Sequence, residues 1–397
     1  GEIKRAVVAG GGFIGLEVAE NLAAKGVKTT VIDFAPHVLP NFLDPEMSEF
    51  VENRMAEAGV MPLTNVALEG VEGDGKVEKV LTSKRAMKAD ALVLAIGIRP
   101  NTAFLEGSGI EMCKGTILTD AHLRTNVEDI YAAGDCAMVA NRQTGKAAWS
   151  PMGSTANIAG RILAQNLAGR DLAYPGVLGT GVAKLPGGWS TGRTGLTETA
   201  ARAEGLDVET VTTVVDDKAH YYPGADVFIV KLTAGRSSRK LLGVQVLGRG
   251  AVDKVTDIAV TAISLGATVD QLAAMDFAYA PPFSTAIHPF AHSVNILLNK
   301  LDGALESITP AQYAAGAAEG WEVIDCAQAP SLPGRRYLNL TDVTGEVAGL
   351  AKDAKLLLVC TKGKRAYLTQ NRLKHYGYTN TRVLEGGVTF TEFESEE

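Results

Sequence analysis

Three glycines near the start of the chain have the spacing of a turn that binds phosphate groups. Gly10, Gly12 and Gly15 follow the apolar run IKRAVVA, and a stretch of helical composition comes directly after them. In such a turn the first glycine permits a tight bend, the second lets the backbone approach a pyrophosphate, and the third lets a helix pack on a strand. The free N–H groups at the start of the helix then bind the phosphates. This spacing indicates a dinucleotide site.

Asp33 sets the expected choice of dinucleotide. It closes the apolar run VKTTVID, 18 residues after Gly15. An acid at this place accepts hydrogen bonds from the adenine ribose hydroxyls and repels a 2′-phosphate. The following residues, FAPH, supply no arginine that would reverse the choice, so we expect NADH, with NADPH as the alternative. A chance cluster of glycines would explain the spacing alone, but not the strand–helix–strand pattern around it.

A second carboxylate stands at the end of a short apolar run. Residues 130–133, IYAA, predict a buried strand, and Gly134–Asp135 follow directly. Ligands of open α/β sheets bind beyond the carboxyl ends of the strands. We therefore expect the Asp135 carboxylate to hold part of a ligand.

Cys360 has surroundings that suit a reactive sulfur. It ends the apolar run LLLVC and is followed by TKGKRAYL, in which Gly363 gives the loop flexibility. Consecutive backbone N–H groups, the charges of Lys362, Lys364 and Arg365, and the start of a helix would all favour a thiolate or a persulfide anion. A cysteine that ends a strand by chance is the alternative.

The segments that must position these residues alternate between strand and helix patterns. The first 33 residues read as strand, glycine turn, helix and strand, and residues 44–59 predict a helix with Asp44 as its N-cap. Strand-like segments follow at VEGDGKVEKVLT, where Asp74–Gly75 signals a hairpin, and at ADALVLAIG. Residues 153–169 then predict a helix with small residues that allow close approach.

The pattern changes in the second half of the chain. VETVTTVVDD, DVFIVKLTA and KLLGVQVLG are β-rich, as in an antiparallel sheet, whereas AVDKVTDIAVTAISLG and PFAHSVNILLNKL are helical. This predicts an α+β domain. From about residue 308 the short strands WEVIDC, RRYLNL and AKLLLVC alternate with the helix-like TDVTGEVAGLA and RAYLTQNRLKHYG, which indicates a small further α/β domain.

Composition excludes several kinds of partner. The chain has 397 residues, of which 46% are hydrophobic and 21% charged, and a formal net charge of −7. It has no long basic run, so nucleic acid is not an expected partner. No apolar stretch reaches the roughly 20 residues that cross a bilayer, and the four scattered cysteines fit a reducing cytoplasm. His288 and His292 have an i, i+4 spacing that permits metal binding, but Pro289 separates them and no third ligand is evident, so we expect no metal.

Several motifs, in order and spacing, resemble a known family. GGGFIGLEVAENL, AIGIRPN and YAAGDCA resemble the pyridine nucleotide–disulfide oxidoreductases. WSPMGSTANIAGR, GTGVAKL, RTGLTE and YAPPFS resemble a narrower branch, which holds coenzyme A-disulfide reductases, NADH-dependent persulfide or polysulfide reductases, and related NADH oxidases. The motifs are many and collinear, and they cover nearly the whole chain.

The resemblance implies an FAD site and an NADH site. In the family the Gly-Asp motif holds FAD, with the Asp on the ribityl chain, and this carries over to Gly134 and Asp135. The helix beginning near Gly153 would present its N-terminus to the flavin, where its dipole stabilises negative charge on the reduced ring. The further cofactor-binding positions that the resemblance implies are Phe13, Ile14, Glu17, Gly97, Ser154, Thr155 and Ala156.

Two of these positions lie beside the expected nicotinamide, and a third covers the flavin. Ile14 and Glu17 match family positions next to the nicotinamide ring, and Phe13 matches the aromatic residue that shields the flavin when NADH is absent. An alternative for Glu17 is a first-turn acid that only complements the helix dipole.

The resemblance also implies a homodimer. YYPGADVFIVKL and YAPPFSTAIHPF match the family's dimerisation domain, which reaches across a two-fold axis into the partner's active site. By position, Tyr222 or its neighbour Tyr221, and Tyr279, would lie near the redox sulfur and donate to a thiolate or protonate a leaving thiol. A buried tyrosine with a satisfied hydroxyl is the alternative.

The Cys360 loop resembles the active-site loop of rhodaneses, and VLEGG at 383–387 matches the segment near such a domain's end. Asp325 and Pro333–Gly334 match as well, but Ala327 stands where the usual motif has an arginine. Cys326 is a candidate second thiol near Cys360. The two other cysteines, Cys113 and Cys136, are expected to be structural.

The chain also departs from the family pattern. The family begins with another strand–helix–strand unit, which binds the FAD diphosphate, and a redox cysteine follows soon after it. Neither is found here, so we expect an FAD-binding segment with that cysteine upstream of Gly1. The expected division is an NAD(H)-binding domain at 1–115, part of an FAD domain at 116–170, a dimerisation domain at 171–305 and a rhodanese-like domain at 308–397.

Together these patterns predict an α/β protein with a Rossmann-type domain. The expected function is that of an FAD- and NADH-dependent reductase of disulfide, persulfide or polysulfide sulfur, possessing a fused sulfurtransferase domain and using coenzyme A as a substrate or ligand. The alternatives are an NADH oxidase or peroxidase, and a sulfur carrier or NADH-binding protein without flavin.

Overall fold

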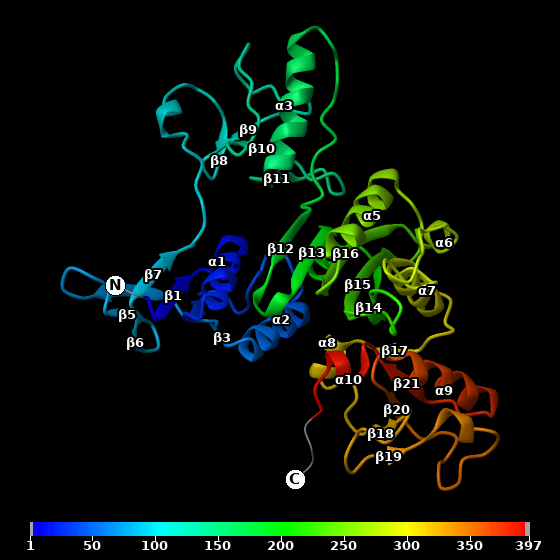
Figure 1. The fold of residues 1–397 in the computed structure, drawn as a ribbon. Helices are drawn as coiled ribbons and strands as arrows, with labels where there is room; N and C mark the ends of the chain where they lie inside the picture. The colour runs from blue at the N-terminus through cyan, green and yellow to red at the C-terminus, as the bar shows by residue number, and fades with distance from the viewer. Residues whose placement is uncertain (1–2, 394–397) are drawn as a thin grey trace.

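A computed structural model describes residues 3–393 of the chain (Figure 1). Within these residues the strands form five sheets, of which two are wholly parallel, two are antiparallel and one is mixed. Helices lie against the larger sheets. The predicted mixed α/β architecture is therefore confirmed.

The first parallel sheet carries the glycine turn. Its strand order is β3-β2-β1-β7, and the small antiparallel sheet β4-β5-β6 lies between β3 and β7 in sequence. The buried side chains of β1 and β2 pack against α1 and α2 in one apolar cluster. The elements are β1 (Arg5–Ala9), α1 (Phe13–Ala24), β2 (Lys28–Ile32), α2 (Pro45–Glu57), β3 (Val60–Leu63), β4 (Leu68–Glu72), β5 (Lys79–Thr82), β6 (Ala86–Lys88) and β7 (Ala91–Leu94).

The segment after β7 forms a separate lobe. Figure 1 shows it in the upper part of the view, joined to the remainder by extended chain. Its helix α3 has Ala159 as its one buried residue. The elements are η1 (Ala103–Leu105), β8 (Met112–Cys113), β9 (Thr116–Leu118), β10 (Ala137–Ala140), β11 (Ala147–Trp149) and α3 (Gly153–Leu167).

The strand predicted at 130–133 is wrong. Tyr131 forms an isolated bridge with Arg124. The backbone of this run bonds instead to the preceding loop, since the Ala132 N–H donates to the Leu123 carbonyl at 3.1 Å. The strand of this region is β10, which begins after Gly134–Asp135, so the Asp135 carboxylate precedes a strand.

A five-stranded antiparallel sheet forms the centre of the molecule. Its order is β12-β13-β16-β15-β14. Alternate side chains face opposite sides, so Val230 and Leu232 pack on α5 and α7, whereas Ile229 packs on the α2 side. The elements are β12 (Gly181–Lys184), η2 (Pro186–Gly188), β13 (Ser190–Gly195), α4 (Glu198–Ala203), β14 (Val208–Asp216), β15 (Val227–Gly235), β16 (Leu241–Gly248), α5 (Val252–Leu265), α6 (Val269–Ala273) and α7 (Pro289–Leu301).

The C-terminal unit is the second parallel sheet, with the order β17-β21-β20-β18-β19. All four residues of the central strand β20 are buried. Figure 1 places this unit below the antiparallel sheet. The elements are β17 (Ser307–Ile308), α8 (Pro310–Ala314), β18 (Glu322–Asp325), β19 (Arg336–Tyr337), η3 (Leu340–Asp342), β20 (Leu356–Val359), α9 (Lys364–His375), β21 (Thr381–Leu384) and α10 (Gly387–Phe390).

The helix predicted from TDVTGEVAGLA is wrong. Only the short 3-10 helix η3 (Leu340–Asp342) overlaps the start of this segment, and residues 343–351 consist of bends, one turn and irregular chain. Gly349 has a positive φ of 69°, and the Val347 N–H donates to the Tyr378 hydroxyl at 2.8 Å. The glycine and this external hydrogen bond favour turns over a continuous helix.

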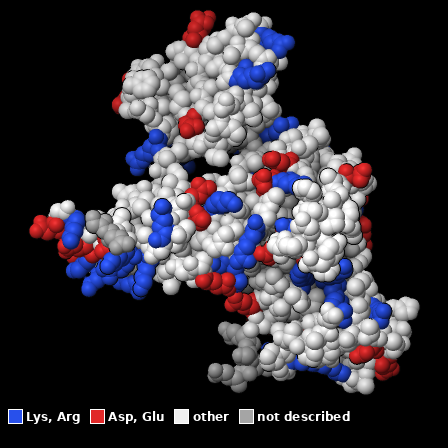
Figure 2. Space-filling model, viewed as in Figure 1, with Lys and Arg blue, Asp and Glu red and all other residues white. Residues whose placement is uncertain are grey.

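On the face shown in Figure 2, basic and acidic side chains are interspersed, apart from a basic group beside β5 and β6. No helix in residues 3–393 has both the length and the apolar character that a bilayer-crossing segment requires.

Candidate functional site

The glycine turn has the geometry that the sequence predicts. A Cβ on Gly15 would lie 1.8 Å from the Gly10 carbonyl oxygen, so α1 approaches the turn more closely than any other residue permits. Gly10 itself has a φ of +113°, and a Cβ there would meet the Ala95 carbonyl at 2.1 Å. Gly12 faces open space, with nothing within 4 Å of a Cβ. The first and third glycines therefore serve packing, and the second leaves room for a ligand.

Asp33 closes the same turn from β2. Its Oδ2 accepts the Gly11 N–H at 2.6 Å and its Oδ1 accepts the Ala35 N–H at 2.8 Å. The side chain stays partly exposed. Each carboxylate oxygen has a second lone pair, so the fixed carboxylate can still accept ribose hydroxyls.

The residues expected beside the nicotinamide lie at the start of α1. Ile14 is 59% exposed, and Glu17 lies one turn further along with its Oε1 accepting the Lys184 N–H at 3.3 Å. Phe13 points elsewhere: its ring meets the Phe42 ring edge-on, with centroids 4.6 Å apart. Ile14 and Glu17 thus form an accessible surface, whereas Phe13 is held in apolar packing.

Gly97, the remaining candidate of this domain, follows β7 with a φ of +109° and nothing within 4 Å of a Cβ. It therefore turns the chain toward the separate lobe without close contacts.

The expected flavin positions come together within that lobe. A Cβ on Gly134 would lie 3.7 Å from the Ala156 Cβ, so the Gly-Asp motif sits directly against the first turn of α3. Asp135 is exposed, and its carbonyl oxygen accepts the Trp149 indole N–H at 2.7 Å. Thr155 shares a hydrogen bond of 3.0 Å with Ser150, and Ser154 is exposed. An exposed carboxylate beside a helix N-terminus suits a ligand with both hydroxyl and electron-rich ring parts.

The lobe with α3 and β10 lies apart from β1 and α1 in Figure 1. The structure therefore does not bring the Asp135 carboxylate and the glycine turn together. Cys136, next to Asp135, donates its thiol to the Ala133 carbonyl at 3.6 Å.

Cys360 lies where β20 ends and α9 begins. It is 3% exposed, and the Ala366 N–H in the first turn of α9 donates to its sulfur at 3.4 Å. Arg365 does not point at the sulfur: its Nε donates to the Cys326 carbonyl at 3.2 Å and its guanidinium reaches Asn339 Oδ1 at 3.2 Å. Arg365 therefore joins the Cys360 loop to two neighbouring loops.

The VLEGG segment holds this loop from the other side. The Val388 N–H donates to the Cys360 carbonyl at 3.1 Å. A Cβ on Gly387 would lie 1.9 Å from that same oxygen, and Gly387 has a φ of +56°. Only glycine permits this approach.

Glu385 and Lys362 attach the sulfur loop to the antiparallel sheet. The buried Glu385 carboxylate accepts the Lys300 ammonium at 2.6 Å and the Thr212 N–H at 2.7 Å. Lys362 donates to Asp216 at 2.5 Å. Burial lowers the pKa of Lys300, but the Glu385 and Glu209 carboxylates outweigh it, and the net shift is upward.

The tyrosines expected at a partner's site are exposed in this chain. Tyr221 is 69%, Tyr222 37% and Tyr279 52% exposed. The alternative of buried tyrosines with satisfied hydroxyls is therefore wrong for the chain by itself.

The two histidines have separate roles. His288 caps α7 by accepting the Phe290 N–H at 3.2 Å, and burial lowers its pKa to about 4. Burial and the Lys364 ammonium lower the pKa of His292, against the opposing effect of the Asp216 carboxylate.

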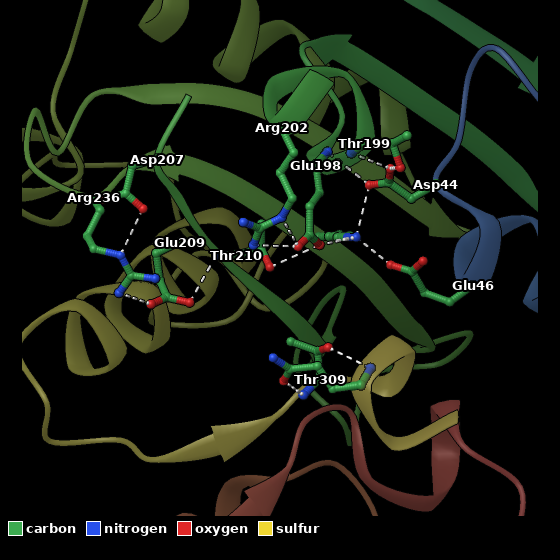
Figure 3. A network of polar contacts seen from close by, with 12 residues as sticks. Asp44, Glu46, Glu198, Thr199, Arg202, Asp207, Glu209, Thr210, Arg236 and Thr309 are labelled. Atoms are coloured by element: carbon green, nitrogen blue, oxygen red, sulfur yellow. Dashed lines mark hydrogen bonds and ion pairs between the residues drawn. The ribbon is translucent and has the colours of Figure 1, made fainter. Parts of the chain in front are cut away.

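A buried charge cluster was not predicted from the sequence. Lys231 on β15 lies 2.9 Å from Asp44 and 2.8 Å from Glu198, and it also pairs with Glu46. Figure 3 shows the three carboxylates converging from α2 and α4. Within residues 3–393, Asp44, Glu46 and Glu198 are the group of acids close enough together to hold a metal ion. The Lys231 ammonium lies among these carboxylates. The sequence feature that points to this buried cluster is Lys231 itself, a charged residue inside the apolar run VFIVKLTA.

Asp44 occupies the predicted N-cap position of α2, yet its side chain does not cap that helix. It accepts the N–H groups of Glu198 and Thr199 at the start of α4, at 3.1 and 3.0 Å. Despite burial, Lys231 and Thr199 hold its pKa well below the usual range. The cluster therefore joins the glycine-turn domain to the antiparallel sheet.

Comparison with known proteins identifies the class. Residues 1–154 match the family description "Pyridine nucleotide-disulphide oxidoreductase", and residues 188–291 match the dimerisation domain of the same family. A NAD-dependent persulfide reductase from A. fulgidus is 34% identical, with a TM-score of 0.90, over 98% of this chain and 72% of that one. The chain belongs to the pyridine nucleotide-disulphide oxidoreductase family. Its relatives are enzymes that use FAD and NAD(P)H.

Two curated relatives point to different activities within that family. An NAD(P)H coenzyme A polysulfide/persulfide reductase from Pyrococcus horikoshii is 35% identical over 75% of this chain and 66% of its own length. An NADH oxidase from Methanocaldococcus jannaschii is 33% identical over 75% of this chain and 66% of its own length. The chain thus spans 66% of the length of each of these two relatives.

Proposed function

We propose that the protein is an NADH-dependent flavoprotein reductase of disulfide, persulfide or polysulfide sulfur, with coenzyme A-linked sulfur as its substrate class. Its C-terminal domain would be a rhodanese-like sulfur carrier. The observation that carries the proposal is that one chain holds both an NADH-type glycine turn and Cys360, whose sulfur accepts a hydrogen bond from the first turn of a helix. An enzyme that reduces only oxygen has no use for such a sulfur site.

The residues of the two cofactor sites fit the groups that they would hold. Gly12 leaves space for a pyrophosphate, and Asp33 offers acceptors to ribose hydroxyls. Asp135 and the first turn of α3 suit the ribityl chain and ring of FAD. When bound, FAD supplies an acceptor for the hydride of NADH. The exposed side chain of Ile14 provides an apolar surface for the nicotinamide.

Cys360 would carry sulfur as a persulfide. Its thiolate attacks the sulfane sulfur of a donor, the donor's sulfur–sulfur bond breaks, and the donor leaves as an anion. The N–H groups at the start of α9 then stabilise the terminal sulfur. Arg365 acts as a positioning residue, because it fixes the loops that border the sulfur.

We propose the four-part division at 1–115, 116–170, 171–305 and 308–397. The separate sheets support it except at the first boundary, where β8 (Met112–Cys113) pairs with β9 of the second part. We further propose a homodimer in a reducing cytoplasm, in which the exposed Tyr222 and Tyr279 contribute to the partner's site. The match to a dimerisation domain supports the assembly.

An NADH oxidase is the second candidate, because a relative of similar identity carries that name. The two are separated by NADH consumption in the presence of coenzyme A persulfide, compared with oxygen alone. We expect consumption to depend on the persulfide. Equal rates in both conditions would favour the oxidase.

Two measurements on this chain test the proposal directly. Incubation with FAD, followed by gel filtration, should leave visible flavin absorbance on the protein. Thiosulfate sulfurtransferase activity should be lost in Cys360→Ser and retained in the control Cys113→Ser. A colourless protein that still accepts sulfur at Cys360 would instead support the sulfur carrier without flavin, and full activity in Cys360→Ser would refute the role of Cys360.

A further inference from the structure

Cys326 is a buried thiol that the proposed sulfur chemistry does not use. It directly follows β18, as Cys360 directly follows β20. The two strands are parallel neighbours, and their register pairs Ile324 with Leu358 and Asp325 with Val359. The Cys326 N–H donates to the Val359 carbonyl at 2.6 Å. The next pair in this register is Cys326 and Cys360.

The two thiols lie on the same face of the sheet. Side chains along a strand alternate between faces, so Cys326 shares the face of Ile324, and Cys360 shares that of Leu358. All four belong to one apolar cluster, which α9 covers through Ala366 and other residues. The cysteine pair is therefore enclosed between the sheet and α9.

The spacing suits a disulfide. Neighbouring strands lie about 4.8 Å apart, and disulfides join residues whose Cα atoms are about 4.4–6.8 Å apart. A bond between Cys326 and Cys360 would therefore require rotation of side chains, with little movement of the backbone. The thiol of Cys326 at present donates to the Ile324 carbonyl at 3.6 Å, a weak contact that a rotation would exchange easily.

The two cysteines differ in their access to dissolved substrates. Cys326 is fully buried, and this burial raises its pKa to about 12, with the nearby Cys360 as a further contribution. A buried neutral thiol is inert toward dissolved reagents. Cys360, at the edge of a loop with the exposed residues Thr361 and Lys364, is the member that substrates approach. Cys326 can therefore react only through Cys360.

We propose that Cys326 is a resolving thiol for persulfide held on Cys360, an inference that rests on the sulfur-carrier role proposed above. When no acceptor removes the sulfur, the anionic terminal sulfur of the persulfide accepts the Cys326 proton, and the Cys326 thiolate attacks the Cys360 Sγ. The bond between Sγ and the terminal sulfur breaks, a Cys326–Cys360 disulfide forms, and the terminal sulfur leaves with the Cys326 proton as hydrogen sulfide. The two cysteines lose two electrons and the sulfane sulfur gains them, so no outside oxidant is required.

Attack at Sγ follows from the position of Cys326. Cys326 lies beside Sγ under the loop, whereas the N–H groups that would hold the terminal sulfur belong to the loop and the start of α9. A low-molecular-weight thiol restores the pair by thiol–disulfide exchange at Cys360. The reaction ends sulfur loading whenever acceptor thiols are scarce, and it keeps Cys360 in a reversible state.

The experiment follows the sulfur on the intact protein. Reduced wild type, Cys326→Ala, and the control Cys113→Ala are incubated with excess thiosulfate and no acceptor, then alkylated under denaturing conditions. Intact mass and peptide mapping identify persulfide and disulfide, and released sulfide is measured in parallel. Alanine is chosen because a buried cysteine packs as a small apolar residue.

We expect persulfide on wild-type Cys360 to give way to a Cys326–Cys360 disulfide and about one equivalent of sulfide. In Cys326→Ala the persulfide should persist, with sulfide release at least about tenfold slower, because an intramolecular thiol has a high effective concentration. The Cys113→Ala control should match wild type.

Two contrary results are distinguishable. Persulfide that persists on wild-type Cys360 as long as on Cys326→Ala, without a disulfide between these cysteines, would overturn the resolving role alone. Absence of persulfide on Cys360 in both proteins would refute the sulfur-carrier role and the resolving reaction with it.

Discussion

Replacement of Lys231 by methionine tests how firmly the buried charge cluster joins two domains. The Lys231 side chain is 3% exposed, and its ammonium lies 2.9 Å from Asp44 and 2.8 Å from Glu198. At an effective dielectric of about 20, one such pair attracts by about 5–6 kcal/mol. Desolvation and repulsion among the carboxylates offset much of this. Removal of one partner from a buried ion pair costs about 3–5 kcal/mol, because the remaining charges stay buried without compensation.

Thermal unfolding gives the measurement. A loss of about 1 kcal/mol lowers Tm by about 2–4 °C in a domain of this size, so Lys231→Met should lower the first transition at pH 7 by about 10 °C. The matched control is Lys79→Met, which breaks an exposed pair with Glu72 at 3.4 Å. Such a pair contributes less than about 1 kcal/mol, so the control should shift Tm by no more than about 4 °C.

The pH dependence of Tm is a second, independent test of the charge cluster. In the wild type the pKa values of Asp44 and Glu198 are lowered, so their stabilisation is present at neutral pH and is lost as pH falls through those lowered pKa values. Without Lys231 their burial raises both pKa values instead, and protonation on acidification relieves the penalty. The Tm difference between wild type and variant should therefore shrink from pH 7 to pH 4. A deficit no larger than that of Lys79→Met, or one that grows on acidification, would refute the reasoning.

Three further predictions concern the cofactor turn and the C-terminal domain. Asp33→Asn should weaken NADH binding about tenfold or more, with less effect on NADPH, since hydrogen bonds to a charged group contribute about 1.5–3 kcal/mol. Calorimetric titration of both nucleotides checks this prediction, and equal losses of affinity for the two would contradict it. Gly15→Ala should lower Tm because its Cβ would meet the Gly10 carbonyl, whereas Gly12→Ala should leave Tm unchanged and weaken NADH binding. Reversal of that pattern would show that the glycine roles are misassigned. Glu385→Ala should destabilise the C-terminal domain by about 2 kcal/mol, because it removes one of the two carboxylates, Glu385 and Glu209, that pair with the buried Lys300 ammonium. Faster proteolysis near residues 302–310 checks this, and an unchanged rate would contradict the docking role.

Local patterns in the sequence predicted what local physics determines. The glycine turn, α1, α3 and α7 formed where helix periodicity and turn residues indicated, because each depends on neighbours in sequence. The strand expected at 130–133 failed because a strand also needs a paired neighbour, and that run bonds to its own preceding loop. The apolar pattern of a segment does not show whether a neighbouring strand is present to pair with it.

The candidate site also contains features that neighbours in sequence determine and features that depend on tertiary contacts. Cys360 and its loop were predicted from residue types, and the neighbourhood of Cys326 was raised as a hypothesis. Arg365 was expected at the sulfur, but it donates to two neighbouring loops, a contact that depends on how β18 and β19 are placed. The partners of Lys231 lie on α2 and α4, far away in the sequence, so only the buried lysine itself was visible beforehand.

The position of Glu385 has a consequence for recombining such proteins. Glu385 belongs to the VLEGG segment, whose glycines press on the Cys360 loop, while its counter-charge Lys300 belongs to α7 of the preceding domain. A C-terminal unit excised after α7, or grafted onto a foreign partner, would carry the Glu385 carboxylate without the Lys300 ammonium and the Thr212 N–H that bind it here. Functional chimeras should therefore be cut ahead of α7, so that the donor fragment keeps both members of the pair.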